Sequence, residues 1–292
     1  MVAQQLSLFP KDPTTIPPFK TQFLKWIGNK QRIAHTIISH FPWHYDNYIE
    51  PFVGSGAVLG TLAPQRAIAS DVMKPLIDLW QMLQSQPETV IEWYTTRWKR
   101  FQAQPDYAYR SIQASYNAAA NAADLLFLSR SCYGGVIRFR KDGYMSTPQG
   151  VHTPISPESF RERALTWHQR IQGTTFLHGD FEATMAAAQK DDIVYCDPPY
   201  WETQAILYGA QAFSLPRLLK SISECKDRGV HVVLSIDGTK KSGKNPIAIP
   251  FPPGLFEHEV YLTLGRSMLR RFQLEGSTLE AEIVTDRLLL TY

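Results

Sequence analysis

The stretch DIVYCDPPYW, residues 192–201, joins a short apolar run to an acid, two prolines and two aromatic rings. Its first part, Ile193–Cys196, has the length and composition of a buried strand. Asp197 precedes a proline and is therefore steered towards extended geometry, while Pro198 and Pro199 have no N–H group to donate. The chain thus leaves the strand at a stiff corner, where the Asp197 carboxylate and the Pro198 carbonyl are two fixed acceptors.

Tyr200 adds a flat ring beside these two acceptors. Paired acceptors next to an aromatic face suit the exocyclic amino group of a planar base. The alternative is an acidic loop that the prolines merely stiffen. The corner by itself leaves both interpretations open.

Strand-like and helical segments alternate on both sides of this corner. Strand-like runs are YDNYIEPF, RAIASDV, TTFLHGD and VHVVLSID, and helical spacing begins near Lys30 and returns in residues 74–84, 111–128 and 215–229. This alternation predicts an α/β fold with a mostly parallel sheet. The last two strand candidates, HEVYLTLG and EIVTDRLLLTY, have no helix between them, so we expect an antiparallel hairpin at the sheet edge.

A second unusual loop, EPFVGSG, follows the first strand candidate. Its glycines allow close approach of the backbone to a ligand, and Asp71, 15 residues after Gly56, could hold a ribose. The spacing G-x-G-x-x-x-G departs from the dinucleotide fingerprint, which disfavours a nicotinamide oxidoreductase. A tight strand-to-helix turn without a ligand is the alternative. In an open α/β sheet both loops belong at the carboxyl ends of strands, so they are expected to share one crevice.

The composition sets limits on the class of protein. The 292 residues are 44% hydrophobic and 20% charged, with a net charge of +3 and a pI near 8.6, compatible with nucleic-acid binding without proving it. Three scattered cysteines and isolated histidines predict no disulfide framework and no metal site. With no signal peptide and no membrane span apparent, we expect a soluble, cytoplasmic protein.

Between residues 80 and 165 aromatic and basic residues become more frequent, and SCYGGVIRFRKDGYMS, residues 131–146, reads as a β-hairpin. Val136, Arg138 and Arg140 alternate along its first strand, and Asp142-Gly143 is a typical turn. A two-stranded ribbon fits the major groove of DNA, where arginine can read guanine. A solvated hairpin with ordinary surface cations is the alternative.

Taken together, FLKWIGNK, EPFVGSG, RSCYGGVIRFRKDGYMSTPQG, FLHGDF and DPPY resemble the S-adenosylmethionine-dependent amino methyltransferases of DNA, in particular Dam-like adenine methylases. The motifs follow that family's order and span roughly residues 22–200. The resemblance implies a Rossmann-like methyltransferase fold with an inserted helical and β-hairpin target-recognition domain. It divides the chain into a catalytic domain of residues 1–80 and 166–292 and an inserted domain of residues 81–165.

The resemblance also assigns roles to individual residues. The expected cofactor-binding residues are Trp26, Lys30, Phe52, Gly54, Ser55, Gly56, Asp71, Asp180, Phe181 and Asp197. The expected catalytic residues are Asp197, Pro198, Pro199 and Tyr200. The expected DNA-binding residues are Arg130, Tyr133, Gly134, Val136, Arg138, Arg140, Lys141 and Pro148. GATC-type enzymes typically carry Asn at the positions of Gly134 and Arg140, and this departure argues against GATC as the target.

The function implied is transfer of a methyl group from S-adenosylmethionine to the N6 amino group of adenine in double-stranded DNA. A base in a duplex must be flipped out to be reached. The first alternative is methylation of cytosine at N4, because the same two acceptors suit both amino groups. The second is a catalytically silent DNA-binding protein. We expect a monomer without a metal, in the setting of DNA methylation or restriction-modification.

Overall fold

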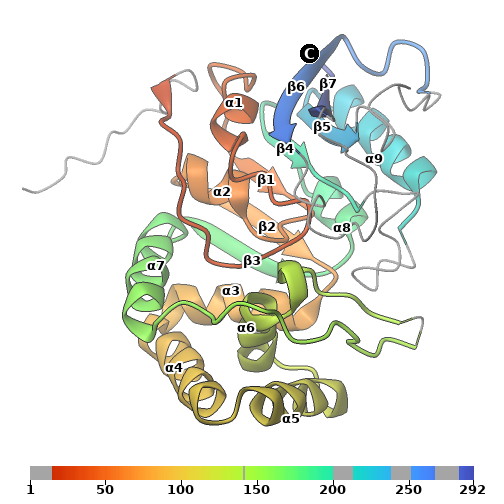
Figure 1. The fold of residues 1–292 in the computed structure, drawn as a ribbon. Helices are drawn as coiled ribbons and strands as arrows, with labels where there is room; N and C mark the ends of the chain where they lie inside the picture. Colours follow the sequence, from red (N-terminus) through yellow and green to blue (C-terminus); the bar gives the residue numbers. More distant parts are fainter. Residues whose placement is uncertain (1–14, 141, 200–212, 238–250, 267–282) are drawn as a thin grey trace, which may run out of the picture.

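The computed structural model describes residues 15–140, 142–199, 213–237, 251–266 and 283–292. Its centre is a seven-stranded sheet in the order β3-β2-β1-β4-β5-β7-β6 (Figure 1). The strands are β1 (Tyr48–Glu50), β2 (Ala67–Asp71), β3 (Thr174–His178), β4 (Ile193–Cys196), β5 (His231–Asp237), β6 (His258–Arg266) and β7 (Ile283–Leu290). All seven strands were expected from the sequence.

The strand directions confirm the predicted mixed sheet. Strands β1 to β5 pair in parallel, whereas β7 pairs antiparallel with both β5 and β6. The last two strands thus pair antiparallel as expected, with β7 inserted between β5 and the edge strand β6. Because β7 runs backwards, its first half lies at the carboxyl edge of the parallel strands, where Asp286 is opposite Asp237 of β5.

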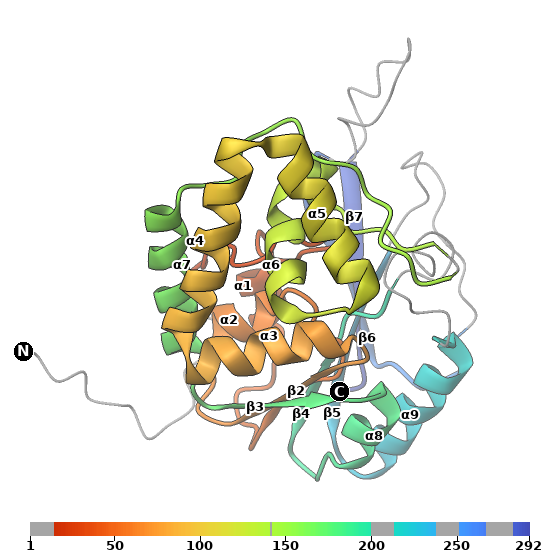
Figure 2. The same ribbon diagram turned by 90° about the horizontal axis from the view of Figure 1, so that it is seen from below.

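Helices cover both faces of the sheet (Figure 2). On one face lie α1 (Ala34–Ile38), α2 (Ala57–Leu62), α3 (Lys74–Ser85), α4 (Pro87–Ala103), α5 (Pro105–Ala118), α6 (Ala122–Ser131) and α7 (Pro157–Arg170). On the other face lie α8 (Phe181–Ala186) and α9 (Leu215–Asp227). This three-layer arrangement is the expected Rossmann-like methyltransferase fold.

Strand β4 shows how the sheet separates two apolar cores. Ile193 and Tyr195 belong to the core under α1–α7, while Val194 and Cys196 belong to the core under α8 and α9. All four side chains are buried because successive residues of a strand point to opposite faces and both faces are covered. This explains why the run before Asp197 is continuously apolar rather than alternating.

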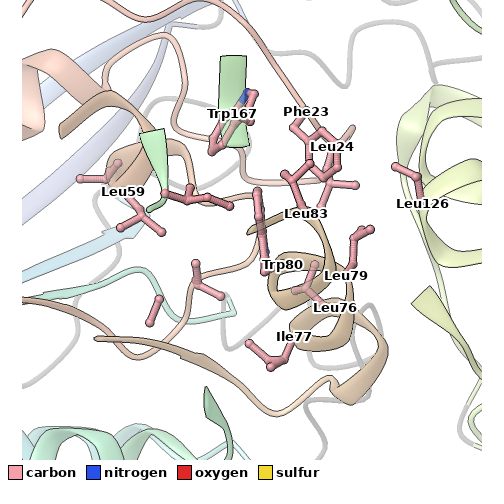
Figure 3. Close-up of a cluster of buried hydrophobic side chains, with 14 of the residues drawn as sticks. Phe23, Leu24, Leu59, Leu76, Ile77, Leu79, Trp80, Leu83, Leu126 and Trp167 are labelled. Carbon is pink, nitrogen blue, oxygen red and sulfur yellow. The ribbon is translucent and has the colours of Figure 1, made fainter. Parts of the chain in front are cut away.

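The inserted helices share the larger core with the sheet. The ring centre of Trp80 in α3 lies 5.4 Å from that of Trp167 in α7 and 5.4 Å from that of Phe23. Leu126 of α6 borders the same cluster (Figure 3). A side chain at Gly60 would collide with the Trp167 ring, so a glycine lets α7 pack directly on α2. The expected domain limits at residues 80 and 165 fall inside α3 and α7, and the aromatic cluster continues across both.

Two expectations about helices need correction. The segment near Lys30 forms a turn, and regular helix is confined to the five residues of α1. Residues 111–128 form two helices rather than one, because Asn121 accepts a hydrogen bond from the Asp124 N–H and starts a new helix there. Helix α7 was not expected, although Ser156 followed by Pro157 is a helix-start signal.

The predicted hairpin is present in an irregular form. Phe139 pairs antiparallel with Met145, and Arg140 and Tyr144 are joined by a backbone hydrogen bond of 2.9 Å. Gly143 has φ of +83°, as the Asp-Gly turn requires. The pairing consists of single bridges rather than continuous strands, because side chains interrupt it: Thr147 Oγ1 accepts from the Arg138 N–H.

Other general expectations concern cysteines, metals and membranes. Cys132, Cys196 and Cys225 are buried and unbridged. The described residues contain no group of three or more His, Cys, Asp or Glu side chains suited to a metal ion. Within the described ranges, every helix is too short or too polar to cross a membrane.

Candidate active site

One cavity lies at the carboxyl edge of the sheet, and both unusual loops line it. The glycine turn after β1 forms one wall and the Asp197-Pro198-Pro199 corner after β4 forms another. The sequence-predicted residues that line it are Trp26, Lys30, Phe52, Gly54, Ser55, Asp71, Asp180, Phe181, Asp197, Pro198 and Pro199. Gly54 and Asp197, which are 143 positions apart in the chain, therefore line the same cavity.

The glycine turn is held tightly against its neighbours. Gly54 has φ of +43°, and a Cβ there would lie only 3.1 Å from Trp26 Nε1. Its N–H donates to Asp71 Oδ2 at 3.2 Å, and its carbonyl accepts from Trp80 Nε1 at 3.1 Å. Burial raises the pKa of Asp71, while backbone donors from Gly54 and Met73 oppose this shift. The turn thus fixes one oxygen of Asp71 on Gly54 and the other on the Met73 N–H.

Gly56 is the one expected cofactor residue of this turn that the structure leaves out of the cavity lining. It begins α2 with φ of +62°, and a Cβ would lie 3.3 to 3.4 Å from Trp80 and Trp167. A positive φ and close aromatic packing both explain a glycine here. Its structural role is to join the turn to the aromatic core.

The opposite end of the cavity is aromatic. Phe52 stacks on Phe181 with ring centres 5.2 Å apart, and the rings of Phe213 and Phe52 meet edge to face with their centres 6.0 Å apart. Asp180 caps α8, and its Oδ1 accepts from the Glu182 N–H at 3.0 Å and from Arg217 at 3.1 Å. This end offers flat apolar surfaces beside an anchored carboxylate.

The other end of the cavity is strongly polar. Lys30 Nζ lies 2.9 Å from Asp197 Oδ1 and 3.3 Å from Asp286 Oδ2. Lys30 is only 4% exposed and Asp286 is fully buried, whereas the Asp197 side chain is 20% exposed. Burial raises the pKa of Asp197 to about 6, and Lys30 limits that increase.

Glu50 is a second buried acid beside Asp197. Its Oε2 accepts from the Tyr48 hydroxyl at 2.6 Å and from the Leu59 N–H at 3.1 Å. Burial raises the pKa of Glu50 to about 8, with a further contribution from the charge of Asp197. Near neutral pH Glu50 is therefore mostly protonated, which leaves Asp197 as the ionised member of this pair.

The recognition residues divide into exposed and buried groups. Tyr133, Gly134, Arg138, Arg140 and Pro148 are exposed, and the Arg140 guanidinium lies 4.6 Å over the ring of Tyr144. Expected residues Tyr200 and Lys141 lie outside the described residues.

Of two other expected DNA contacts, Val136 is buried and Arg130 is half-buried. Val136 is only 6% exposed, so its side chain is not available at the surface. Arg130 donates to the carbonyl oxygens of Phe23 at 2.6 Å and Gln22 at 3.4 Å, and its guanidinium lies 5.9 Å from the centre of the Phe160 ring. Burial lowers the pKa of Arg130. Arg130 therefore ties the N-terminal segment to α6.

Sequence reasoning missed several residues of the site. Glu50, Val72, Met73, Tyr195 and Phe213 line the cavity, and Asp286 lies behind Lys30. Asp286 carried a usable signal, since an acid inside the apolar run IVTDRLLL is unusual for a central strand. Phe213 carried none, because nothing in the sequence indicates that the segment before α9 reaches the cavity.

Comparison with known proteins gives the family. The model of the D12 class N6 adenine-specific DNA methyltransferases matches residues 26–244. A DNA adenine methylase of Haemophilus influenzae is 31% identical over 249 residues, covering 80% of this chain and 85% of the relative. A DNA adenine methylase of Vibrio cholerae is 29% identical, covering 73% and 80% respectively. A type II methyltransferase of Lactococcus lactis is 27% identical, covering 79% and 84%.

These matches are to enzymes, and the family is specific for adenine. The matches favour adenine over cytosine as the target base, a choice that the two acceptors of the corner had left open. They also argue against a nicotinamide oxidoreductase. The cavity that joins the glycine turn to the Asp197 corner agrees with this assignment. The chain belongs to the D12 class of N6 adenine-specific DNA methyltransferases.

Proposed function

We propose that this protein uses S-adenosylmethionine to methylate N6 of a flipped adenine in duplex DNA, and that the cavity at the carboxyl edge is where transfer takes place. The observation that carries this proposal is that the Gly54 turn and the Asp197 corner line one cavity. A cofactor site and a base site must adjoin for direct transfer, and two loops that line one cavity are compatible with this requirement.

The residues of the cavity suit the chemistry of that cofactor. Phe52 and Phe181 offer flat faces to an adenine ring, with the Asp180 carboxylate beside them. Asp71 and Lys30 line the same cavity. Asp71 would accept hydrogen bonds from the ribose hydroxyls, and Lys30 would pair with the methionine carboxylate. When bound, S-adenosylmethionine supplies a methyl group activated by a sulfonium centre.

The Asp197 corner would hold the target base. The ionised carboxylate of Asp197 and the carbonyl of Pro198 would accept hydrogen bonds from the amino group and direct its lone pair towards the cofactor side. Tyr200, which directly follows, would stack on the base. The amino nitrogen loses a proton as it gains the methyl group, and the Asp197 carboxylate is suited to accept it. Catalysis of this kind depends on positioning and electrostatics.

The exposed part of the hairpin is the proposed DNA-reading surface. The expected recognition residues Arg138, Arg140, Tyr133, Gly134 and Pro148 are all exposed. Arginine reads guanine in the major groove through two hydrogen bonds. Since Gly134 and Arg140 stand where GATC-type enzymes typically have Asn, we propose a target other than GATC.

A direct assay tests the proposed function. The purified protein is incubated with radiolabelled S-adenosylmethionine and a library of duplexes, and the DNA is digested and its nucleosides separated. We expect label in N6-methyladenine within one sequence context, and none with the D197A variant. Label in N4-methylcytosine would overturn the choice of base, and DNA binding without any label would support the silent DNA-binding protein.

A further inference from the structure

We propose that Asp286 is a positioning residue, whose buried carboxylate holds the Lys30 ammonium in place so that Asp197 can leave Lys30 and engage the target amino group. The part of this proposal that concerns the amino group rests on the proposed function. The part that concerns Lys30 and Asp286 is a statement about the folded protein alone.

The geometry is a cation between two acids of different exposure. Lys30 Nζ lies 2.9 Å from Asp197 on the cavity side and 3.3 Å from Asp286 on the interior side. Asp286 is fully buried, whereas Asp197 is 20% exposed and lines the cavity. Of the two acids, only Asp197 is in a position to meet a substrate.

The sheet topology explains how an acid from the end of the chain reaches this place. Strand β7 is antiparallel to β5, so Asp286 lies level with Asp237, the last residue of β5. The carboxyl ends of β4 and β5 are at the same edge, which places Asp286 next to the corner that follows β4. An acid elsewhere on β7, towards Leu290, would be at the opposite edge.

Electrostatics gives the second acid a function. Lys30 is 4% exposed, and a buried ammonium that loses its counter-ion is strongly destabilised. If Asp197 were the only protein carboxylate beside Lys30, turning Asp197 towards the base would leave the proposed methionine carboxylate of the cofactor to balance the Lys30 charge alone. With Asp286 in place, Lys30 retains one carboxylate while Asp197 changes partner.

The first experiment is a stability cycle that needs no activity. It compares the thermal unfolding of wild type, K30M, D286N and K30M/D286N. We expect K30M to lower Tm by roughly 5–10 °C because the buried Asp286 loses its ion pair with Lys30. The double variant should recover most of that loss, since removing the buried charge removes its cost. A double variant no more stable than K30M would overturn the pairing.

The second experiment separates binding from transfer in D286N. With Asp286 neutral, Lys30 should hold Asp197 more tightly, so we expect the single-turnover rate to fall about tenfold while the Kd for S-adenosylmethionine changes less than about threefold. A wild-type rate with an unchanged pH profile would overturn the positioning role. If wild type transfers no methyl group, the proposed function fails, while the stability cycle still tests the ion pair.

The pH profile adds a readout that a purely structural role would not move. The groups that face Asp197 are Lys30, Asp286, Glu50 of β1 and Tyr195 of β4. The charge of Asp286 raises the pKa of Asp197, so D286N should shift the acid limb of the rate profile to lower pH. As the matched control, D78N removes an acid from the exposed ion pair with Lys74 and should change neither Tm nor this limb.

Discussion

The polar end of the cavity and the recognition hairpin are built in different ways. Asp197 is held on Lys30 beside a buried Glu50, and the surrounding strands are buried on both faces. The hairpin is joined by isolated bridges and presents Arg138 and Arg140 at the surface. A rigid sheet edge suits chemistry that is common to a family, whereas an exposed ribbon can change side chains without disturbing the core. We therefore expect substitutions at the polar end of the cavity to change the rate of methyl transfer, and substitutions in the exposed part of the hairpin to change selectivity for DNA sequence.

The largest effect is expected from D197A. Loss of the carboxylate removes both an acceptor for the amino group and a proton acceptor, so single-turnover transfer should fall by at least about 10³-fold. Because Lys30 keeps Asp286, the Kd for S-adenosylmethionine should stay within about tenfold of wild type. Rapid-quench assays and equilibrium titration measure the two quantities. Near-wild-type transfer would remove Asp197 from the proposed mechanism.

The pH dependence is the next largest effect. Since Asp197 acts as a carboxylate and its pKa is raised to about 6, kcat/KM should fall about tenfold per pH unit below pH 6. The contribution of Asp197 to the free energy of unfolding should instead increase as the pH falls. A raised carboxyl pKa means that the folded state binds the proton more tightly, so the Asp197 contribution to stability decreases as pH rises from about 4 to 6.

Measuring the free energy of unfolding and kcat/KM over the same pH range tests whether the two change in opposite directions. Glu50 has the same sign, with its contribution decreasing as pH rises towards its pKa of about 8. E50Q should therefore flatten the stability profile between pH 6 and 8 while leaving the acid limb of activity near pH 6. If E50Q shifted the acid limb of the activity profile, the group that titrates near pH 6 would be Glu50 rather than Asp197.

A pair of arginine variants compares the hairpin with the core. R138A should weaken binding by about 1–3 kcal/mol and relax selectivity at one base pair, because Arg138 is an exposed candidate for base reading. R130A should instead lower the free energy of unfolding by about 1–3 kcal/mol and leave selectivity intact, because Arg130 donates to the backbone carbonyls of Gln22 and Phe23. Two measurements distinguish the effect of R138A from that of R130A. One is binding to a set of duplexes with single base changes, and the other is unfolding by denaturant. A uniform loss for R138A over all duplexes would identify a phosphate contact.

The Arg130 and Arg138 pair also shows what could be predicted from the sequence. Strand positions and the shared crevice followed from apolar runs, glycines and the Asp-Pro corner, because these are local features with direct geometric consequences. The positions of Arg130 and Val136 depend on how the N-terminal segment and the hairpin fold back on the inserted helices, and no local pattern records such contacts. An acid within an apolar strand marked Asp286 as unusual, but nothing local indicated its partner Lys30, which is more than 250 residues away in the chain.

The smallest effect is expected at the aromatic end of the cavity. Arg217 pairs with Asp180 and Glu182 and lies 5.2 Å from the centre of the Phe181 ring, but it is 38% exposed, so solvent screens these ion pairs. R217A should raise the Kd for S-adenosylmethionine about two- to fivefold, with the transfer rate at saturation unchanged, because Asp180 and Phe181 lose support without losing their own contacts. K220A, which removes a more exposed ion pair with Glu224 on the same helix, is the control and should bind like wild type. Equal Kd values for the two variants would mean that Arg217 of α9 does not support the cofactor end of the cavity.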